Sequence, residues 1–297
     1  MTKLSFNDLA NLRLLLSVEG IGPGKIRNLL KQFRSLSYIL SSDYKTLTSV
    51  EGISTNLARR IIQSKASKDD IRNKVEEELG KLSKISAKII TVWDSSYPSI
   101  LKKIFDPPLL LYIIGDFTEQ DNYSISTVGT RMPTNYGTIQ CEKIVAELAQ
   151  QNITIVSGLA RGIDSIAHRT ALKNGSRTIA VIGSGLDVIY PPENRDLAGQ
   201  IIERGAIISD YPVGTAPESS NFPPRNRIIS GLSLAVIVIE AGETSGALIT
   251  AEFAAEQGRE VFAVPGPVTS EFSRASSILL KNGAKLVESA DDIIEES

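Results

Sequence analysis

The chain of 297 residues contains one cysteine, Cys141, and one histidine, His168. A single cysteine cannot form an internal disulfide, so nothing indicates an oxidising compartment. One residue of each type is also too few for a zinc site built from histidine and cysteine. We therefore predict that the protein has no disulfide framework and no metal site, and we assign it no cofactor.

Long hydrophobic runs are also missing. The longest strongly apolar runs, such as residues 234–239, are far shorter than the ~20 residues of a membrane helix. Near the N-terminus, Asp8 and Arg13 flank a short apolar stretch that has no small-residue cleavage site, which argues against a signal peptide. With 42% apolar residues the composition is that of a soluble globular protein. We expect a cytoplasmic protein without a membrane partner.

The charge is unevenly distributed along the chain. Residues 1–88 hold 16 lysines and arginines against 9 acidic residues, whereas residues 89–297 hold 16 against 25. Such asymmetry predicts that the basic part meets a polyanion, although a helical domain with a solvated basic face would show the same balance. We predict two domains, residues 1–88 and residues 89–297, with an extended segment 89–118 that leads into the second.

The first domain contains a repeat. Residues 18–21, Val-Glu-Gly-Ile, recur as residues 50–53, and each copy precedes apolar residues spaced three and four apart, as on a helix face. In the first copy, the glycines of the turn permit a tight hairpin whose helix-start N–H groups can hold a phosphate. This pattern resembles the SAM-like helix-hairpin-helix module, which grips nucleic-acid backbones without reading sequence. The expected backbone contacts are Gly22, Gly24, Lys25 and Arg27.

The second hairpin departs from that pattern, because Ser54, Thr55 and Asn56 replace the glycines. Its grip on a phosphate should therefore be weaker. A purely structural interpretation, in which both turns only pack helices together, remains open at this point.

The second domain alternates apolar runs with helical stretches. Near-continuous apolar runs separated by helices predict a doubly wound, mainly parallel sheet that is covered on both faces. In such α/β sheets, ligands bind beyond the carboxyl ends of the strands. The candidate strands are residues 125–128, 153–156, 178–182, 206–208, 234–239 and 261–264.

Small and polar residues follow several of these strands. Small residues before a helix let backbone N–H groups converge on an anion, so we predict a phosphate pocket at this edge. The residues that should form it are Gly129, Thr130, Arg131, Ser157, Gly158, Arg161, Gly162, Ser245 and Gly246. The dinucleotide fingerprint fails, because Gly183 and Gly185 are followed by Val188, and the sequence contains no P-loop.

The most informative stretch begins at Phe222. Arg225 and Arg227 flank Asn226 directly after a proline pair, at the start of an apolar helix. Arginines at a helix start are unfavourable by ~0.3–1 kcal/mol each, so a bound anion should offset them. Arginine suits phosphates, and a phenylalanine ring can stack a base. The alternative is that Phe222 belongs to the core and the arginines pair with carboxylates.

The sequence offers little support for a catalytic site. Asp164 lies four residues before His168, a spacing that favours a local polar contact over acid–base catalysis. The sequence has no G-x-S-x-G nucleophile elbow.

Together these motifs resemble the bacterial DNA-processing protein A family, also called DprA or Smf. The resemblance covers about residues 90–290. The matching segments are Tyr97-Pro98, residues 106–108, 128–131, 157–164, 167–168, 190–192, 222–233, 240–241, 245–251, 258–261 and 264–266. Two places depart from the family: residues 218–221 lack a basic residue before Phe222, and residues 273–277 lack the usual Gly- and Asn-containing loop.

The resemblance implies a Rossmann-like protein that binds single-stranded DNA, protects incoming DNA in natural transformation and loads the recombinase RecA onto it. It implies a homodimer without enzymatic activity. The implied DNA pocket comprises Arg131, Ser157, Gly158, Phe222, Arg225, Asn226 and Arg227. We expect Arg131 and Arg225 to bind DNA without supporting the fold.

Two alternatives differ in class. A nucleotide-processing enzyme on the related lysine-decarboxylase-like fold would need a Pro-Gly-Gly-x-Gly-Thr loop, which residues 240–246 do not form. A purely interacting adaptor would not need the basic first domain.

Overall fold

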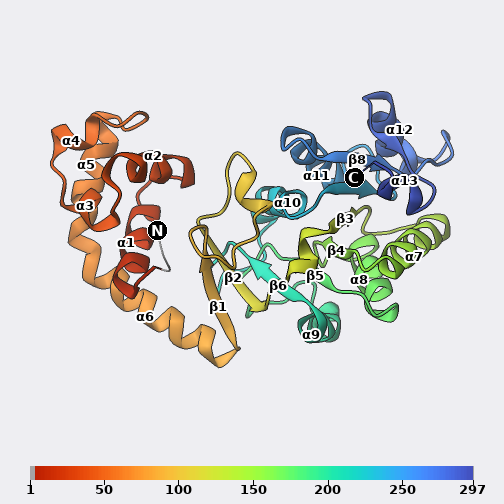
Figure 1. Cartoon of the computed structure of the whole chain (residues 1–297), viewed down its shortest axis with the longest axis horizontal. Coiled ribbons are helices and arrows are strands. Elements are labelled where there is room, and N and C mark those ends of the chain that lie inside the picture. Colours follow the sequence, from red (N-terminus) through yellow and green to blue (C-terminus); the bar gives the residue numbers. More distant parts are fainter. Residues whose placement is uncertain (1–3, 297) are drawn as a thin grey trace. The chain divides into compact units, whose positions relative to one another are not determined.

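The computed structural model describes residues 4–296 (Figure 1). Within them the chain forms two compact units. The first comprises residues 4–84 with 91–95 and 106–109, and the second comprises residues 85–90, 96–105 and 110–296. The extended segment 89–118 is therefore divided between the two units, because the chain passes from one to the other more than once.

The first unit is helical. Side chains of Ser5, Asp43 and Ser54 accept hydrogen bonds at helix starts, as N-caps do. Ile26 and Ile61 are fully buried, which confirms the apolar helix faces predicted from the spacing. The helices are α1 (Phe6–Leu16), α2 (Pro23–Phe33), α3 (Leu36–Ser41), α4 (Tyr44–Thr48), α5 (Thr55–Ser64) and α6 (Lys68–Lys84).

The second unit contains a nine-stranded sheet in the order β1-β2-β6-β5-β4-β3-β7-β8-β9. The neighbouring strands from β6 to β9 are parallel, and β2 is antiparallel to β6. All the candidate strands are present, each with its ends within one residue of the prediction. The strands are β1 (Ala87–Thr91), β2 (Leu110–Gly115), β3 (Ser124–Val128), β4 (Thr154–Ser157), β5 (Thr178–Val181), β6 (Ala206–Ser209), β7 (Ala235–Val238), β8 (Glu260–Ala263) and β9 (Lys285–Leu286).

Helices cover both faces of this sheet, as the apolar runs predict. On β3, Ile125 packs into the core with Leu148 of α7, while the hydroxyl of the next residue, Ser126, donates to the carbonyl of Ile229 on α10. Figure 1 shows α7 beside α8, and α10 beside α11. The helices are α7 (Asn135–Gln150), α8 (Ile163–Lys173), α9 (Arg195–Arg204), α10 (Phe222–Gly231), α11 (Gly246–Glu256), α12 (Arg274–Lys281) and α13 (Asp291–Ile294).

The strand order reverses between β3 and β7. The chain proceeds from β3 to β4 on one side, and β7 returns to pair with β3 on the other. In doubly wound sheets such a switch point opens a crevice at the carboxyl ends of the strands, where ligands bind. The topology therefore places the loops after β3 and β7 beside a binding crevice.

Within residues 4–296, no helix combines the length and the hydropathy that a membrane crossing requires.

Candidate functional site

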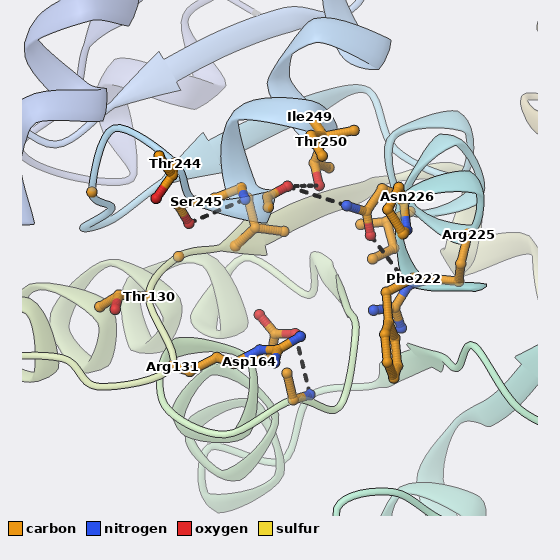
Figure 2. Close-up of a pocket in the computed structure, with 18 of the residues that line it drawn as sticks. Thr130, Arg131, Asp164, Phe222, Arg225, Asn226, Thr244, Ser245, Ile249 and Thr250 are labelled. Carbon is orange, nitrogen blue, oxygen red and sulfur yellow. Dashed lines mark hydrogen bonds between the residues drawn. The ribbon is translucent and has the colours of Figure 1, made fainter. Parts of the chain in front are cut away.

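A pocket of about 720 Å³ lies at this switch point (Figure 2). The loop after β3, the start of α10 and the start of α11 line it. Most of the residues predicted for the phosphate pocket and the Phe222 stretch reach it: Gly129, Thr130, Arg131, Phe222, Arg225, Asn226, Ser245 and Gly246. Ser157, Gly158, Arg161, Gly162 and Arg227 do not line it.

The N-terminus of α11 forms one wall of the pocket. Ser245 is the N-cap, and its Oγ accepts the N–H of Ala247 at 3.3 Å. The carbonyl of Gly246 accepts a hydrogen bond from Asn226 Nδ2 at 3.1 Å, which ties α10 to α11. Within residues 4–296, the backbone N–H of Gly246 donates to no protein group. A free N–H at the start of an 11-residue helix favours an anion there.

Arg131 supplies positive charge to the same pocket. Its side chain is exposed, and it makes no ion pair within the described part of the chain. The preceding residue, Thr130, is held on both sides: its N–H donates to the carbonyl of Glu240 at 2.6 Å, and its carbonyl accepts the N–H of Ile163 at 3.1 Å. A Cβ on Gly162 would lie 2.4 Å from that carbonyl, so only glycine fits there. Gly162 thus lets the Arg131 loop approach α8.

Phe222 forms the aromatic wall, and its side chain is half-buried. The ring packs over Gly183, where a Cβ would lie 3.0 Å from Cδ1 of the ring. The ring of Tyr190 lies 6.1 Å from that of Phe222, centroid to centroid. The guanidinium carbon of Arg131 lies 5.7 Å from the Phe222 centroid, close enough for a cation–π contact. The ring is therefore fixed at the edge of the pocket, next to a free cation.

Arg225 is only 5% exposed. Its Nη1 donates to the carbonyls of Gly158, at 2.8 Å, and of Val181, and its Nε donates to Asn226 Oδ1 at 3.2 Å. Burial lowers the pKa of Arg225 to about 10, so the guanidinium stays charged at neutral pH. We expected Arg225 not to support the fold. The structure corrects this expectation, because these hydrogen bonds join the segment after β4 to the end of β5.

Arg227 does not line the pocket and forms a 3.0 Å ion pair with Asp210. Burial raises the pKa of Asp210, and the charge of Arg227 opposes that shift. For Arg227, therefore, the alternative interpretation of a carboxylate partner applies.

Ser157 and Gly158 lie beneath the pocket. The hydroxyl of Ser157 donates to the carbonyl of Thr127 at 2.7 Å. A Cβ on Gly158 would lie 2.7 Å from Asp164 Oδ2 and 2.9 Å from Arg225 Nη2, so the glycine leaves room for both side chains.

Burial raises the pKa of Asp164, and the charge of Arg225 opposes that shift. Asp164 Oδ2 accepts the N–H of Ala160 at 3.2 Å. Asp164 thus makes a local polar contact, with Ala160.

Arg161 lies outside the lining of the pocket, in an ion pair with Glu193 at 2.5 Å. That pairing, with a smaller contribution from the nearby Tyr190, raises the pKa of Arg161. Arg161 therefore lies near the aromatic pair of Tyr190 and Phe222.

His168 is fully buried, and its Nδ1 lies 2.6 Å from the hydroxyl of Thr178. Burial lowers the pKa of this imidazole to about 3, so it is neutral at physiological pH. Burial also raises the pKa of the Cys141 thiol. Residues 4–296 contain no group of three histidine, cysteine or acidic side chains placed to hold a metal ion.

The two hairpins of the helical unit differ in how their second helices begin. Gly22 is the N-cap of α2 and provides no side-chain cap, whereas Ser54 caps α5 by accepting the N–H of Leu57 at 3.3 Å. The start of α2 is therefore the more open of the two. Around it, Lys25 Nζ donates to the carbonyl of Gly20 at 2.8 Å.

The other two residues predicted at the first hairpin lie along α2. Arg27 Nη2 is 3.7 Å from Asp106 Oδ1. A Cβ on Gly24 would lie 3.9 Å from Nη2 of that same guanidinium.

Sequence reasoning missed Tyr190 and Glu240 as parts of the site. Tyr190 stood only in a segment of the family resemblance, and Glu240 stood among the polar residues after a strand without a role of its own. The signal that could have found Tyr190 is an aromatic residue directly before a proline pair, the same pattern that drew attention to Phe222.

Two protein-family models match separate parts of this chain. Residues 88–297 match the model of the family DNA recombination-mediator protein A, and residues 12–65 match the SAM-like helix-hairpin-helix tandem. Protein Smf of a Synechocystis strain is 40% identical over 93% of this chain and 69% of its own length. The DNA processing protein DprA of Bacillus subtilis is 42% identical over 76% of this chain and 79% of its own length.

The solved structures of two DprA proteins are also similar to this chain. The X-ray structure of DprA from Streptococcus pneumoniae is similar with a TM-score of 0.79 at 33% identity, covering 99% of this chain and 98% of that one. DprA from Helicobacter pylori, whose structure describes a binding mode for single-stranded DNA, is similar with a TM-score of 0.63 at 30% identity, covering 70% of this chain and 94% of that one.

Proposed function

This chain belongs to the family of DNA recombination-mediator protein A, and from that premise we propose that its pocket binds single-stranded DNA. One observation carries the proposal: the half-buried ring of Phe222 lies beside an unpaired cation, Arg131, in a pocket that the start of α11, with the free N–H of Gly246, also lines. A nucleotide of a single strand presents both a base that can stack on an aromatic ring and a phosphate that needs positive partners. The Helicobacter pylori relative, described as a single-strand binder, supports this assignment.

In the proposed complex the residues divide into two roles. A phosphate is bound by Arg131 and by the start of α11, and a base stacks on Phe222, with Tyr190 extending the aromatic surface. The remaining predicted residues support this surface from below or outside: Ser157, Gly158, Arg161, Gly162, Arg225 and Arg227. The proposal assigns no catalytic step to the pocket.

We propose a second, sequence-independent contact in the helical unit. Because the first hairpin leaves the start of α2 open and the second is capped by Ser54, we assign the phosphate backbone to the first. Its contact residues are Gly22, Gly24, Lys25 and Arg27.

A salt titration of oligonucleotide binding tests the proposed pocket. Affinity should be higher for single strands than for duplexes and should fall with salt, with a slope of about 0.7 per phosphate contact on a single strand. In Arg131→Ala we expect about a ten-fold weaker affinity, since one charge-assisted contact is lost, and a slope smaller by about one contact. The unfolding midpoint should not change, because Arg131 is exposed.

Arg204→Ala is the matched control, because this arginine is exposed at the end of α9 and lies outside the lining of the pocket. It should bind single strands nearly as the wild type does. Equal affinity for duplexes and single strands at every salt concentration would contradict a stacking pocket.

We further propose that the protein acts as a homodimer that loads the recombinase RecA onto incoming single strands in natural transformation. Its membership in the family supports this. Added to single strands coated with a single-strand-binding protein, it should accelerate RecA filament formation, measured by ATP hydrolysis. For a homodimer, analytical ultracentrifugation should give twice the mass of one chain. An unchanged rate with a protein that still binds single strands would contradict the loading role.

A further inference from the structure

Glu240 is a buried carboxylate beside the pocket, only 4% exposed. It follows β7, yet its partners lie after β3. Its Oε2 accepts the N–H of Thr134 and its Oε1 accepts the hydroxyl of the same residue, each at 2.8 Å. Its backbone carbonyl accepts the N–H of Thr130 at 2.6 Å. One residue therefore fixes both ends of the segment 130–134, and Arg131 lies within that segment.

The carboxylate also occupies the start of a helix. Thr134 is the N-cap of α7, and a Cβ on Gly137 in its first turn would lie 2.3 Å from Glu240 Oε2. The N-terminus of a helix attracts negative charge. In nucleotide-binding folds of this topology, the helix after the central strand holds a phosphate at that point. Here the carboxylate of the protein itself takes that position.

This occupation has a consequence for the ligand. A second anion near the start of α7 would be repelled by Glu240, so a phosphate entering the pocket is left with the start of α11 and with Arg131. The carboxylate thus fixes the loop and directs the anion at the same time.

We propose that Glu240 is a positioning residue for single-strand binding, which holds the segment 130–134 so that Arg131 meets the phosphate bound at the start of α11. The inference rests on the proposed function. Glutamate suits the role because both donors on Thr134 need acceptors, and a carboxylate offers two. Glutamine offers one acceptor oxygen and should therefore hold the loop less well.

The test is a double-mutant cycle between Glu240→Ala and Arg131→Ala, read by single-strand affinity and its salt slope. We expect Glu240→Ala to lose about as much affinity as Arg131→Ala, about ten-fold, and to reduce the slope by the same single contact. The double variant should bind no more weakly than either single variant, because both remove the same interaction. Glu240→Gln should fall between the wild type and Glu240→Ala.

Variants of Thr134 test the same contact from its other side. Thr134→Val removes the hydroxyl and should weaken binding, whereas Thr134→Ser keeps it and should bind like the wild type. Leu148→Ala is the stability control: Leu148 is fully buried at the far end of the same helix. It should lower the unfolding midpoint yet keep single-strand affinity at temperatures where the protein is folded.

Losses that multiply in the double variant, to about a hundred-fold, would overturn the inference. So would unchanged affinity in folded Glu240→Ala or, if that variant does not fold, in both Glu240→Gln and Thr134→Val. Unchanged affinity in Arg131→Ala itself would overturn the proposed pocket and this inference with it. A weakened Arg131→Ala beside unaffected Glu240 variants would overturn this inference alone.

Discussion

Phe222→Ala is expected to lose ten-fold or more in single-strand affinity while its unfolding midpoint shifts little. Stacking of a base on an aromatic side chain contributes about 1–3 kcal/mol by alanine substitution. The ring of Phe222 is half-buried and rests on the backbone of Gly183, beside Tyr190. Its removal should therefore cost less stability than the ~3–5 kcal/mol of a phenylalanine buried in a core. Fluorescence anisotropy of a labelled oligonucleotide and urea unfolding measure the two effects separately.

Two variants control this experiment. Phe222→Tyr should bind nearly normally, because a tyrosine ring also offers a face for stacking. Phe253→Ala removes another half-buried ring, on α11 but outside the lining of the pocket, and should leave affinity unchanged. A large loss of stability in Phe222→Ala, with full affinity in the molecules that remain folded, would place the ring in the core and not in the site.

Arg225→Ala is expected to destabilise the fold by about 3–5 kcal/mol, the cost of removing one partner from a buried charged group. The guanidinium donates hydrogen bonds to the carbonyls of Gly158 and Val181, and the variant would leave both carbonyls without these bonds. It also offsets the buried charges of Asp164 and Asp210. Binding by this variant is therefore informative only after correction for the folded fraction, and urea unfolding supplies that correction.

This loss of stability should depend on pH. Burial raises the pKa of Asp164 above its unfolded value, and without Arg225 the pKa should rise further. A carboxyl group with a raised pKa stabilises the folded state while it is protonated and loses that contribution as the pH rises through the folded-state pKa. The deficit of Arg225→Ala relative to the wild type should therefore be largest near neutral pH and should shrink on acidification.

Urea unfolding at about pH 5 and about pH 8 measures the difference. Arg131→Ala, whose side chain is exposed, should match the wild type at both values. An equal deficit of Arg225→Ala at both pH values would show that the lost hydrogen bonds, and not the buried carboxylates, account for the destabilisation.

The sequence by itself determined the elements and the edge at which the site lies. Helix faces such as Ile26 with Leu29, and apolar strands such as residues 178–182, follow from spacing within one segment. Parallel strands separated by helices must end at one edge, so the polar residues after them had to gather there. For that reason Arg131 and Gly246 could be assigned to one pocket from the sequence, whereas Phe222 was assigned to it through the family resemblance.

Only the tertiary structure decided which arginine is free. Arg131, Arg225 and Arg227 look alike in the sequence, because each follows a strand or opens a helix. They differ through partners that lie far away along the chain: Gly158 is 67 residues from Arg225, and Asp210 is 17 residues from Arg227. The contact of Glu240 with Thr134 spans 106 residues. Burial and hydrogen-bond satisfaction are properties of packed segments, so no local pattern contains them.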